Sequence, residues 1–276
     1  MKIFHFILSH SIFISLCAAG LSLQTVQLLS LPLNGYLLAF IFFATLGGYN
    51  TYWMVSKVSA ARHVPLPVFF RKSASTVIVI LIALGGMLYS MTHLHLVMYN
   101  IVITFILLAL YALPLLPVKN LFFARKMGFL KTVLLAFTWA HVTIMIPLQI
   151  SILQLPSNGI LLFCSRFLFM LMLCVIFDKR DAAMDKIRGM HSMATDISHS
   201  LLYFLMLFIF AIYVVISCML SSYGITRLQS AALLIAGVVT LVLYFISLKR
   251  KDYVFYYFVV DGMMFLSSAA TAIATI

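Results

Sequence analysis

The chain contains very few acidic residues. It has six aspartates and no glutamate in 276 residues, and charged residues of both signs make up 9% of the total. Soluble domains carry about 25% charged residues, whereas 64% of this chain is hydrophobic. This composition excludes a soluble globular domain. Because the apolar runs are long and continuous, it also excludes a membrane β-barrel and predicts an all-α polytopic membrane protein.

Cysteine is scarce as well. The four cysteines all lie inside apolar runs, and none forms a CxxC pair. Such cysteines behave as small apolar side chains, so neither a disulfide framework nor a cysteine metal site is expected. The formal charge of +12 would suggest a nucleic-acid partner in a soluble protein. In a membrane protein the same basic residues face anionic headgroups, so membrane lipids are the expected partner and nucleic acid is not.

Nine apolar segments are long enough to cross a bilayer. They cover residues 6–29, 35–56, 74–92, 96–115, 131–152, 158–177, 199–221, 228–248 and 253–274. If these segments alternate in direction, sixteen of the eighteen lysines and arginines fall on one side. The exceptions are Arg166, inside the sixth segment, and Arg227. This bias predicts a single integral membrane domain over residues 1–276, with nine transmembrane helices and a cytoplasmic N-terminus.

Two local patterns predict how these segments pack. Gly47-Gly48 and Gly85-Gly86 lie in the second and third segments, where small residues let helices approach closely. Pro147 interrupts the fifth segment, because proline removes a backbone donor and frees the carbonyl four residues earlier. We expect a neighbouring helix to supply the missing donor.

Four of the six aspartates lie in one stretch, 178-DKRDAAMDKIRGMHSMATD-196, directly after the apolar run of the sixth segment. Asp178, Asp181 and Asp185 are spaced i, i+3 and i+7, so on a helix they share a face about 60° wide. Charge beside a bilayer is costly and tends to mark function, and Mg²⁺ prefers carboxylate and phosphate oxygens. The spacing therefore indicates a metal site. The alternative is a solvated helix end, in which the acids pair with the lysines and arginines of the same stretch.

The segment 166-RFLFMLMLCVIFDKRDAAMDKIRG-189 resembles the second aspartate-rich motif of the UbiA superfamily of intramembrane prenyltransferases. The segments 43-FATLGGYN-50 and 130-LKTVLLAFTWAHVTIMIPL-148 resemble a bacterial branch of that superfamily. The resemblance implies a UbiA-like bundle around a central apolar cavity in the cell (inner) membrane. It implies transfer of an isoprenyl group from an isoprenyl diphosphate to a lipophilic or aromatic acceptor. Asp178, Asp181 and Asp185 would be catalytic and would hold Mg²⁺ against the diphosphate.

The first aspartate-rich motif of that superfamily reads roughly NDxxDxxxD, and the matching residues here are 50-NTYWMVSKV-58. Asn50 keeps the first position, whereas threonine, methionine and valine replace the three aspartates. Basic side chains bind phosphate directly. We therefore expect a hybrid site, with one metal ion on the second motif and Lys57 or Arg71 in place of a second metal. The alternative is that these cations only follow the topological bias.

The candidate substrate-binding residues are Asn50, Lys57, Arg71, Arg180 and Arg166. Arg166 lies in the middle of the sixth segment, so it should face the interior of the bundle, because exposure to lipid would be expensive. There it contacts either an anionic acceptor or an internal carbonyl. The residues do not distinguish these roles.

Two other functions stay open. The missing carboxylates of the first motif favour a catalytically degenerate UbiA-like protein that binds a polyprenyl lipid or quinone. Arg166, Asp261 and the Pro147 kink are typical of a small transporter, because intramembrane charges and broken helices also serve transport. Three acids at the cytoplasmic edge, rather than near the midplane, disfavour transport. Neither the acceptor nor the chain length of the donor is specified by the residues.

Overall fold

The computed structural model describes residues 2–60, 73–95, 97–112, 128–150, 154–187, 191–250 and 252–275. Every regular element in these ranges is helical. The elements are α1 (Lys2–Ser9), α2 (Ile12–Leu28), α3 (Gly35–Ala60), α5 (Ala74–Thr92), α6 (Met98–Ala112), α8 (Gly128–Ala140), η3 (His141–Met145), α9 (Ile146–Leu148), α10 (Ser157–Ile187), α11 (Met193–Asp196), α12 (His199–Met219), η5 (Leu220–Ser222), α13 (Arg227–Ser247), η6 (Phe255–Val260) and α14 (Gly262–Ile273). Each of the nine predicted segments overlaps one or more of these helices.

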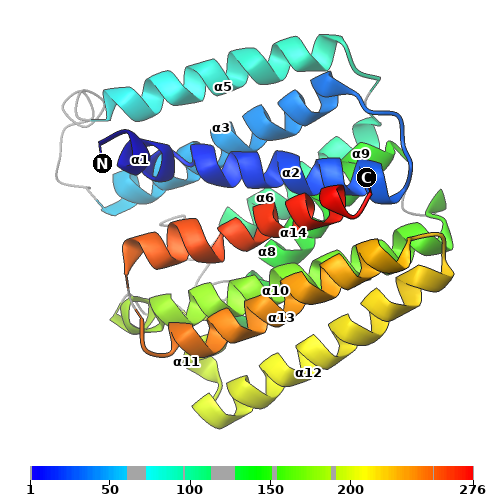
Figure 1. Ribbon diagram of the computed structural model, residues 1–276. Helices are drawn as coiled ribbons and strands as arrows, with labels where there is room; N and C mark the ends of the chain where they lie inside the picture. The colour runs from blue at the N-terminus through cyan, green and yellow to red at the C-terminus, as the bar shows by residue number, and fades with distance from the viewer. Residues whose placement is uncertain are drawn as a thin grey trace.

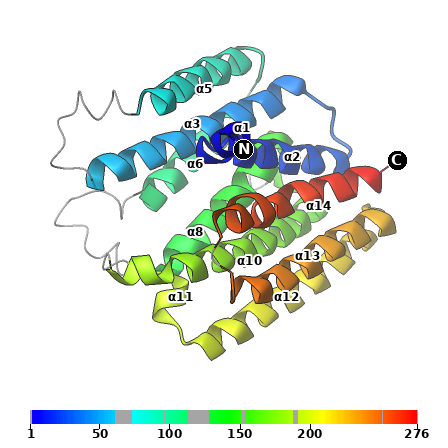
Figure 2. The same ribbon diagram turned by 60° about the vertical axis from the view of Figure 1, so that its left-hand side comes forward.

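The long helices form one layered bundle. In Figure 1, α5, α3, α2, α14, α13 and α12 follow one another from top to bottom, and each contacts the next. Helix α10 contacts α12 and α13 on one side and α8 on the other, and α8 contacts α6. The C-terminal ends of α3 and α10 and the N-terminal end of α8 lie at the same end of the bundle (Figure 2). The two predicted motif positions therefore share one end of the molecule.

The protein is an integral membrane protein. Six described helices are long and apolar enough to cross a bilayer, or seven if the bent pair α1 and α2 is one span. Helix α5 carries large apolar side chains at its surface, including Ile78 (57% exposed), Leu81 (62%) and Leu88 (59%). An unbroken apolar surface of this kind is unfavourable in water and is accommodated by lipid.

Helix α10 is the central helix of the bundle. Its residues from Phe169 to Ile176 are all buried, which explains why the segment is hydrophobic on every face. The helix continues to Ile187, about ten residues beyond the predicted apolar segment. Asp178, Asp181 and Asp185 are therefore all helical, and the predicted i, i+3, i+7 spacing applies to them.

The first predicted segment is not one straight helix. It is broken between α1 and α2, whose axes meet at 65°, and Ser11 at the break has a left-handed conformation (φ 59°). The side chain of Asn50 donates from Nδ2 to the carbonyl of His10 at 2.8 Å. A break leaves backbone carbonyls without helical partners, and Asn50 satisfies one of them. The sequence contains no proline or glycine here that would have indicated the break.

The prediction for Pro147 is confirmed, and the glycine prediction holds for one glycine of each pair: Gly47 and Gly86 lie at the α3–α5 contact, whereas an added Cβ at Gly48 or Gly85 would meet nothing within 4 Å. Gly86 lies against the ring of Phe43, where an added Cβ would come within 2.5 Å of ring carbons, so α3 and α5 approach closely. Helix α8 ends in the π-helical segment η3 just before Pro147. The carbonyl freed by Pro147 is that of Thr143, and it accepts a hydrogen bond from Thr25 Oγ1 of α2 at 2.8 Å. A neighbouring helix thus supplies the donor that proline removes.

Candidate functional site

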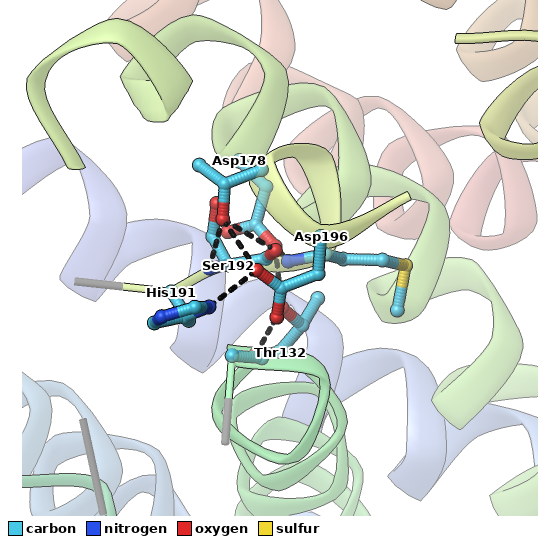
Figure 3. A network of polar contacts seen from close by, with 8 residues as sticks. Thr132, Asp178, His191, Ser192 and Asp196 are labelled. Carbon is cyan, nitrogen blue, oxygen red and sulfur yellow. Dashed lines mark hydrogen bonds and ion pairs between the residues drawn. The ribbon is translucent and has the colours of Figure 1, made fainter. Parts of the chain in front are cut away.

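Asp178 is held at the end of the bundle by two other elements. Its Oδ2 accepts hydrogen bonds from the hydroxyl of Thr132 on α8 and from the backbone N–H of Met193 at 3.3 Å (Figure 3). Both bonds end on Oδ2, so they fix the orientation of the carboxylate. No sequence pattern indicated Thr132 as a site residue, although it lies inside the segment that resembles the bacterial branch.

A short turn covers this carboxylate. His191 Nδ1 pairs with Asp196 Oδ1 at 2.6 Å, and the hydroxyl of Thr195 donates to the same oxygen at 2.9 Å. The backbone N–H of Ser192 donates to Thr195 Oγ1 at 2.7 Å. These bonds close residues 191–196 into a compact turn beside the end of α10 (Figure 3). The fourth acid of the stretch, Asp196, therefore has a local role in shaping the turn that supplies the Met193 N–H.

Gly128 lets this turn approach α8. A Cβ added at Gly128 would lie 2.3 Å from both His191 C and Ser192 N, which is far inside van der Waals contact. The first residue of α8 and the backbone of the turn are therefore packed with no room for a side chain. This close approach brings Thr132 and the Met193 N–H to the same oxygen of Asp178.

Asp181 forms an ion pair with its neighbour Arg180. The guanidinium donates from Nε to Oδ1 at 2.7 Å and from Nη2 to Oδ2 at 2.8 Å. The aspartate side chain is 46% exposed, whereas the arginine side chain is 18% exposed. The acid stretch thus has, at this position, the ion pair that the alternative interpretation predicted.

Arg180 is held by three aromatic rings. Its guanidinium carbon lies 4.8 Å from the ring centroid of Phe177, 5.1 Å from that of Tyr256 and 4.8 Å from that of Tyr257. Cation–π contacts of this length attract an arginine toward each ring. The hydroxyl of Tyr256 donates to the carbonyl of Arg250 at 3.0 Å. The cage is therefore fixed between α10 and η6. The sequence FYYF at residues 255–258 carried no spacing signal that linked it to Arg180.

The remaining acid of the second motif, Asp185, is buried (5% exposed) near the end of α10. The described part of the chain contains no group of three or more His, Cys, Asp or Glu side chains arranged to hold a metal ion. The assignment of all three aspartates to one metal ion therefore stays a prediction.

The predicted first half-site is divided between a buried and an exposed residue. Asn50 is 2% exposed, and its Nδ2 donates to the carbonyls of His10 and Leu46. Lys57 is exposed in the last turn of α3. Arg71 lies outside the described residues. Asn50 therefore has a structural function at the helix break, and substrate binding by Asn50, Lys57 and Arg71 stays a prediction.

Arg166 is a buried cation whose donors are used within the bundle. It is 3% exposed, and Nη1 donates to the carbonyl of Leu21 at 3.1 Å and to Thr143 Oγ1 at 3.2 Å. Nη2 donates to Gln24 Oε1 at 2.5 Å. Of the two contacts considered for Arg166, the contact with a carbonyl inside the bundle is present. Among the described residues no ion pair joins Arg166 to Asp261.

Gln24 extends this network to a third helix. Its Nε2 donates to the carbonyl of Ser267 at 2.9 Å and to Thr271 Oγ1 at 2.9 Å. Helices α2, α10 and α14 and segment η3 are therefore joined by one buried polar network, centred on the guanidinium of Arg166. Gln24 was not identified from the sequence, because a lone glutamine in an apolar run gives no indication of its partner.

Aromatic side chains face one another across the interior. Tyr49 of α3 lies 6.2 Å from Trp139 of α8 between ring centroids, and Tyr52 of α3 stacks on Tyr111 of α6 at 5.4 Å. The four rings come from three helices, and the two from α3 lie in the turns before Lys57. An interior lined in this way is apolar and polarisable.

Comparison with known proteins identifies the fold. No protein-family model matches the chain, and no curated protein sequence matches it. A UbiA homolog from Aeropyrum pernix K1 superimposes with a TM-score of 0.65 at 13% identity, covering 98% of this chain and 99% of that chain. A digeranylgeranylglyceryl phosphate synthase structure superimposes with a TM-score of 0.52 at 12% identity, covering 99% of this chain and 96% of that chain. The chain therefore has the UbiA fold over nearly its whole length, as the sequence resemblance predicted.

Proposed function

We propose that this protein is an intramembrane prenyltransferase of the UbiA type, which transfers an isoprenyl group from an isoprenyl diphosphate to a lipophilic or aromatic acceptor. The observation that carries the proposal is the set of three aspartates at the end of the buried helix α10, in a chain with the UbiA fold. The second structural neighbour is a synthase that is named for a digeranylgeranylglyceryl phosphate product, which supports isoprenoid chemistry as the class of reaction.

The proposed topology is the one that the apolar segments and the basic residues predict. Nine helices cross the inner membrane as a single domain around a central apolar cavity, with the N-terminus and the acid stretch on the cytoplasmic side. The shared end of α3, α8 and α10 (Figure 2) supports this arrangement, because it collects both motif positions at one membrane surface. The aromatic pairs of α3 with α6 and α8 support an apolar interior.

The residues present fit Mg²⁺. Carboxylate oxygens are its preferred protein ligands, and in phosphate sites it usually takes one or two carboxylates, substrate phosphates and several waters. A preformed three-acid cluster is therefore not required. Asp178, whose Oδ2 is fixed by Thr132 and Met193, would hold the ion together with Asp181 and Asp185. Bound there, Mg²⁺ would supply positive charge that stabilises the departing diphosphate.

The protein's own residues supply the other functions. Thr132 and the Met193 N–H orient the carboxylate of Asp178 before substrate binds, which avoids reorganisation during reaction. Lys57 and Arg71 bind the diphosphate directly where the first motif lacks carboxylates. The apolar interior excludes water, which would otherwise intercept an allylic cation. Arg166 binds an anionic acceptor only if its present partners release it.

The test is diphosphate release by purified protein incubated with labelled isoprenyl diphosphates, a panel of acceptors and Mg²⁺. Asp178→Asn should lower the rate by about 100-fold or more. Asp252→Asn is the matched control, because it removes the same charge from a 65% exposed side chain that pairs with Arg250 and is not one of the three motif aspartates, so its rate should equal that of wild type. Absence of diphosphate release with every donor would refute catalysis.

A second function is favoured by one specific observation. Asn50, the residue that keeps the first motif's opening position, has its donors occupied by the carbonyls of His10 and Leu46. This supports a catalytically degenerate protein that binds a polyprenyl lipid or quinone. Such a protein would bind the lipid in a stoichiometric complex but release no diphosphate, so the same assay distinguishes the two functions. Transport has less support, because the donors of the intramembrane Arg166 are used in a structural network.

A further inference from the structure

The ion pair between Arg180 and Asp181 does not join two parts of the fold. The two residues are neighbours on α10, and side chains at i and i+1 of a helix point in different directions. The guanidinium nevertheless turns to present Nε and Nη2 to the carboxylate at 2.7 and 2.8 Å. A pair between neighbouring residues cannot hold α10 against another helix. Stabilisation of the tertiary structure therefore does not explain why the ion pair forms.

The two partners differ in how firmly they are held. Arg180 lies among the rings of Phe177, Tyr256 and Tyr257, and its side chain is 18% exposed. Asp181 is 46% exposed, and Arg180 is its hydrogen-bond partner in the described part of the chain. The carboxylate can therefore rotate into solvent by a change of side-chain torsion, while the guanidinium stays in place. The arginine is the fixed partner, and the acid is the exchangeable one.

The arginine fork accepts a phosphate as readily as a carboxylate. Two parallel N–H groups of a guanidinium match two oxygens of either anion. A cation beside the second motif can bind the phosphate that a second metal ion would otherwise hold. That metal ion lacks its ligands, because the aspartates of the first motif are replaced at residues 51, 54 and 58.

From these observations we propose that the caged guanidinium of Arg180 is a binding site for one phosphate group of a diphosphate, and that Asp181 occupies it as a place-holder until the diphosphate arrives. The ligand class rests on the proposed function. When the diphosphate binds, its oxygens take the Nε and Nη2 donors, and Asp181 turns away to become available as a metal ligand. Arg180 thus exchanges the carboxylate of Asp181 for oxygens of the diphosphate. Asp181 exchanges Arg180 for the metal ion that accompanies the diphosphate.

The exchange predicts that removing Asp181 strengthens diphosphate binding when no metal ion is present. In buffer with EDTA, Asp181 competes with the ligand and contributes nothing to binding, so Asp181→Asn should bind inorganic diphosphate about fivefold to tenfold more tightly than wild type. Asp181→Ala should act in the same direction. With Mg²⁺ present the effect should reverse, because the substitution then removes a metal ligand. The measurement is isothermal titration of the full-length protein with inorganic diphosphate in both buffers.

Three controls make the result specific. Asp252→Asn removes the same charge from an exposed ion pair with Arg250 and should change the affinity by less than about twofold. Arg180→Ala should weaken binding by about tenfold or more in both buffers, and Arg180→Lys should not restore it, because an ammonium lacks the fork. Lys179→Ala removes a neighbouring cation that contacts His199 and should leave most of the affinity intact.

The outcomes separate the two proposals. If Asp181→Asn binds diphosphate no more tightly than wild type in EDTA, or if Arg180→Ala binds it equally well, the place-holder site is wrong, even if the enzyme transfers isoprenyl groups. If both substitutions act as predicted but no donor releases diphosphate, the site stands and the proposed transfer reaction is wrong. Thermal unfolding of each variant confirms that the affinity is measured on folded protein.

Discussion

Gly128→Ala should disorganise the turn that holds Asp178. The added Cβ would lie 2.3 Å from His191 C and Ser192 N, whereas ordinary contact begins at 3.4 Å. The turn must therefore move by about 1 Å. The hydrogen bond from the Met193 N–H to Asp178 is already 3.3 Å long, so a displacement of that size takes it beyond bonding distance.

The expected cost combines two effects. Overpacking at a site without free volume costs about 1–3 kcal/mol, and a lost hydrogen bond to a charged group costs about 1.5–3 kcal/mol. Because both effects arise from one displacement, we expect about 2–4 kcal/mol of destabilisation rather than their full sum. The thermal unfolding temperature in detergent should fall by several degrees, and amide hydrogen exchange over residues 191–196 should accelerate.

Gly48→Ala is the matched control. It is also a helical glycine, and an added Cβ there meets nothing within 4 Å. Replacing an open helical glycine by alanine stabilises by about 0.5–1 kcal/mol, so its unfolding temperature should equal or exceed that of wild type. If Gly128→Ala is as stable as Gly48→Ala and exchanges the Met193 amide at the wild-type rate, Gly128 does not position the turn that binds Asp178.

Two further predictions concern buried contacts. Gln24→Leu removes the hydrogen-bond partner of Arg166 Nη2 and should destabilise the protein by about 3 kcal/mol, because a buried charge loses a hydrogen bond. The double variant Gln24→Leu/Arg166→Leu should be more stable than Gln24→Leu in thermal unfolding. Equal or lower stability of the double variant would contradict this account. Gly86→Ala would place Cβ 2.5 Å from the ring of Phe43 and should lower the unfolding temperature, whereas Gly85→Ala, with nothing within 4 Å, should not; equal effects would show that α3 and α5 are not packed as closely as described.

The helices, the membrane environment and the acid cluster could all be predicted from the residues alone. Apolar runs identify membrane helices because each residue contributes its own transfer free energy, whatever its partners. Asp178, Asp181 and Asp185 could be placed on one helical face because their spacing is local. The carbonyl freed by Pro147 could be anticipated for the same reason, since proline acts on its own helix.

The groups that these residues contact depend on how the helices pack and could not be predicted from the residues. Thr132 and the Met193 N–H bind Asp178, and rings from η6 enclose Arg180. Asn50 satisfies a carbonyl at a helix break that no local residue indicates. These contacts join segments far apart in the chain, and many apolar packings are compatible with the same hydropathy pattern. The shared face of the three aspartates could therefore be predicted from one helix. The residues that contact this face could be identified only from the packing of α10 against its neighbouring elements.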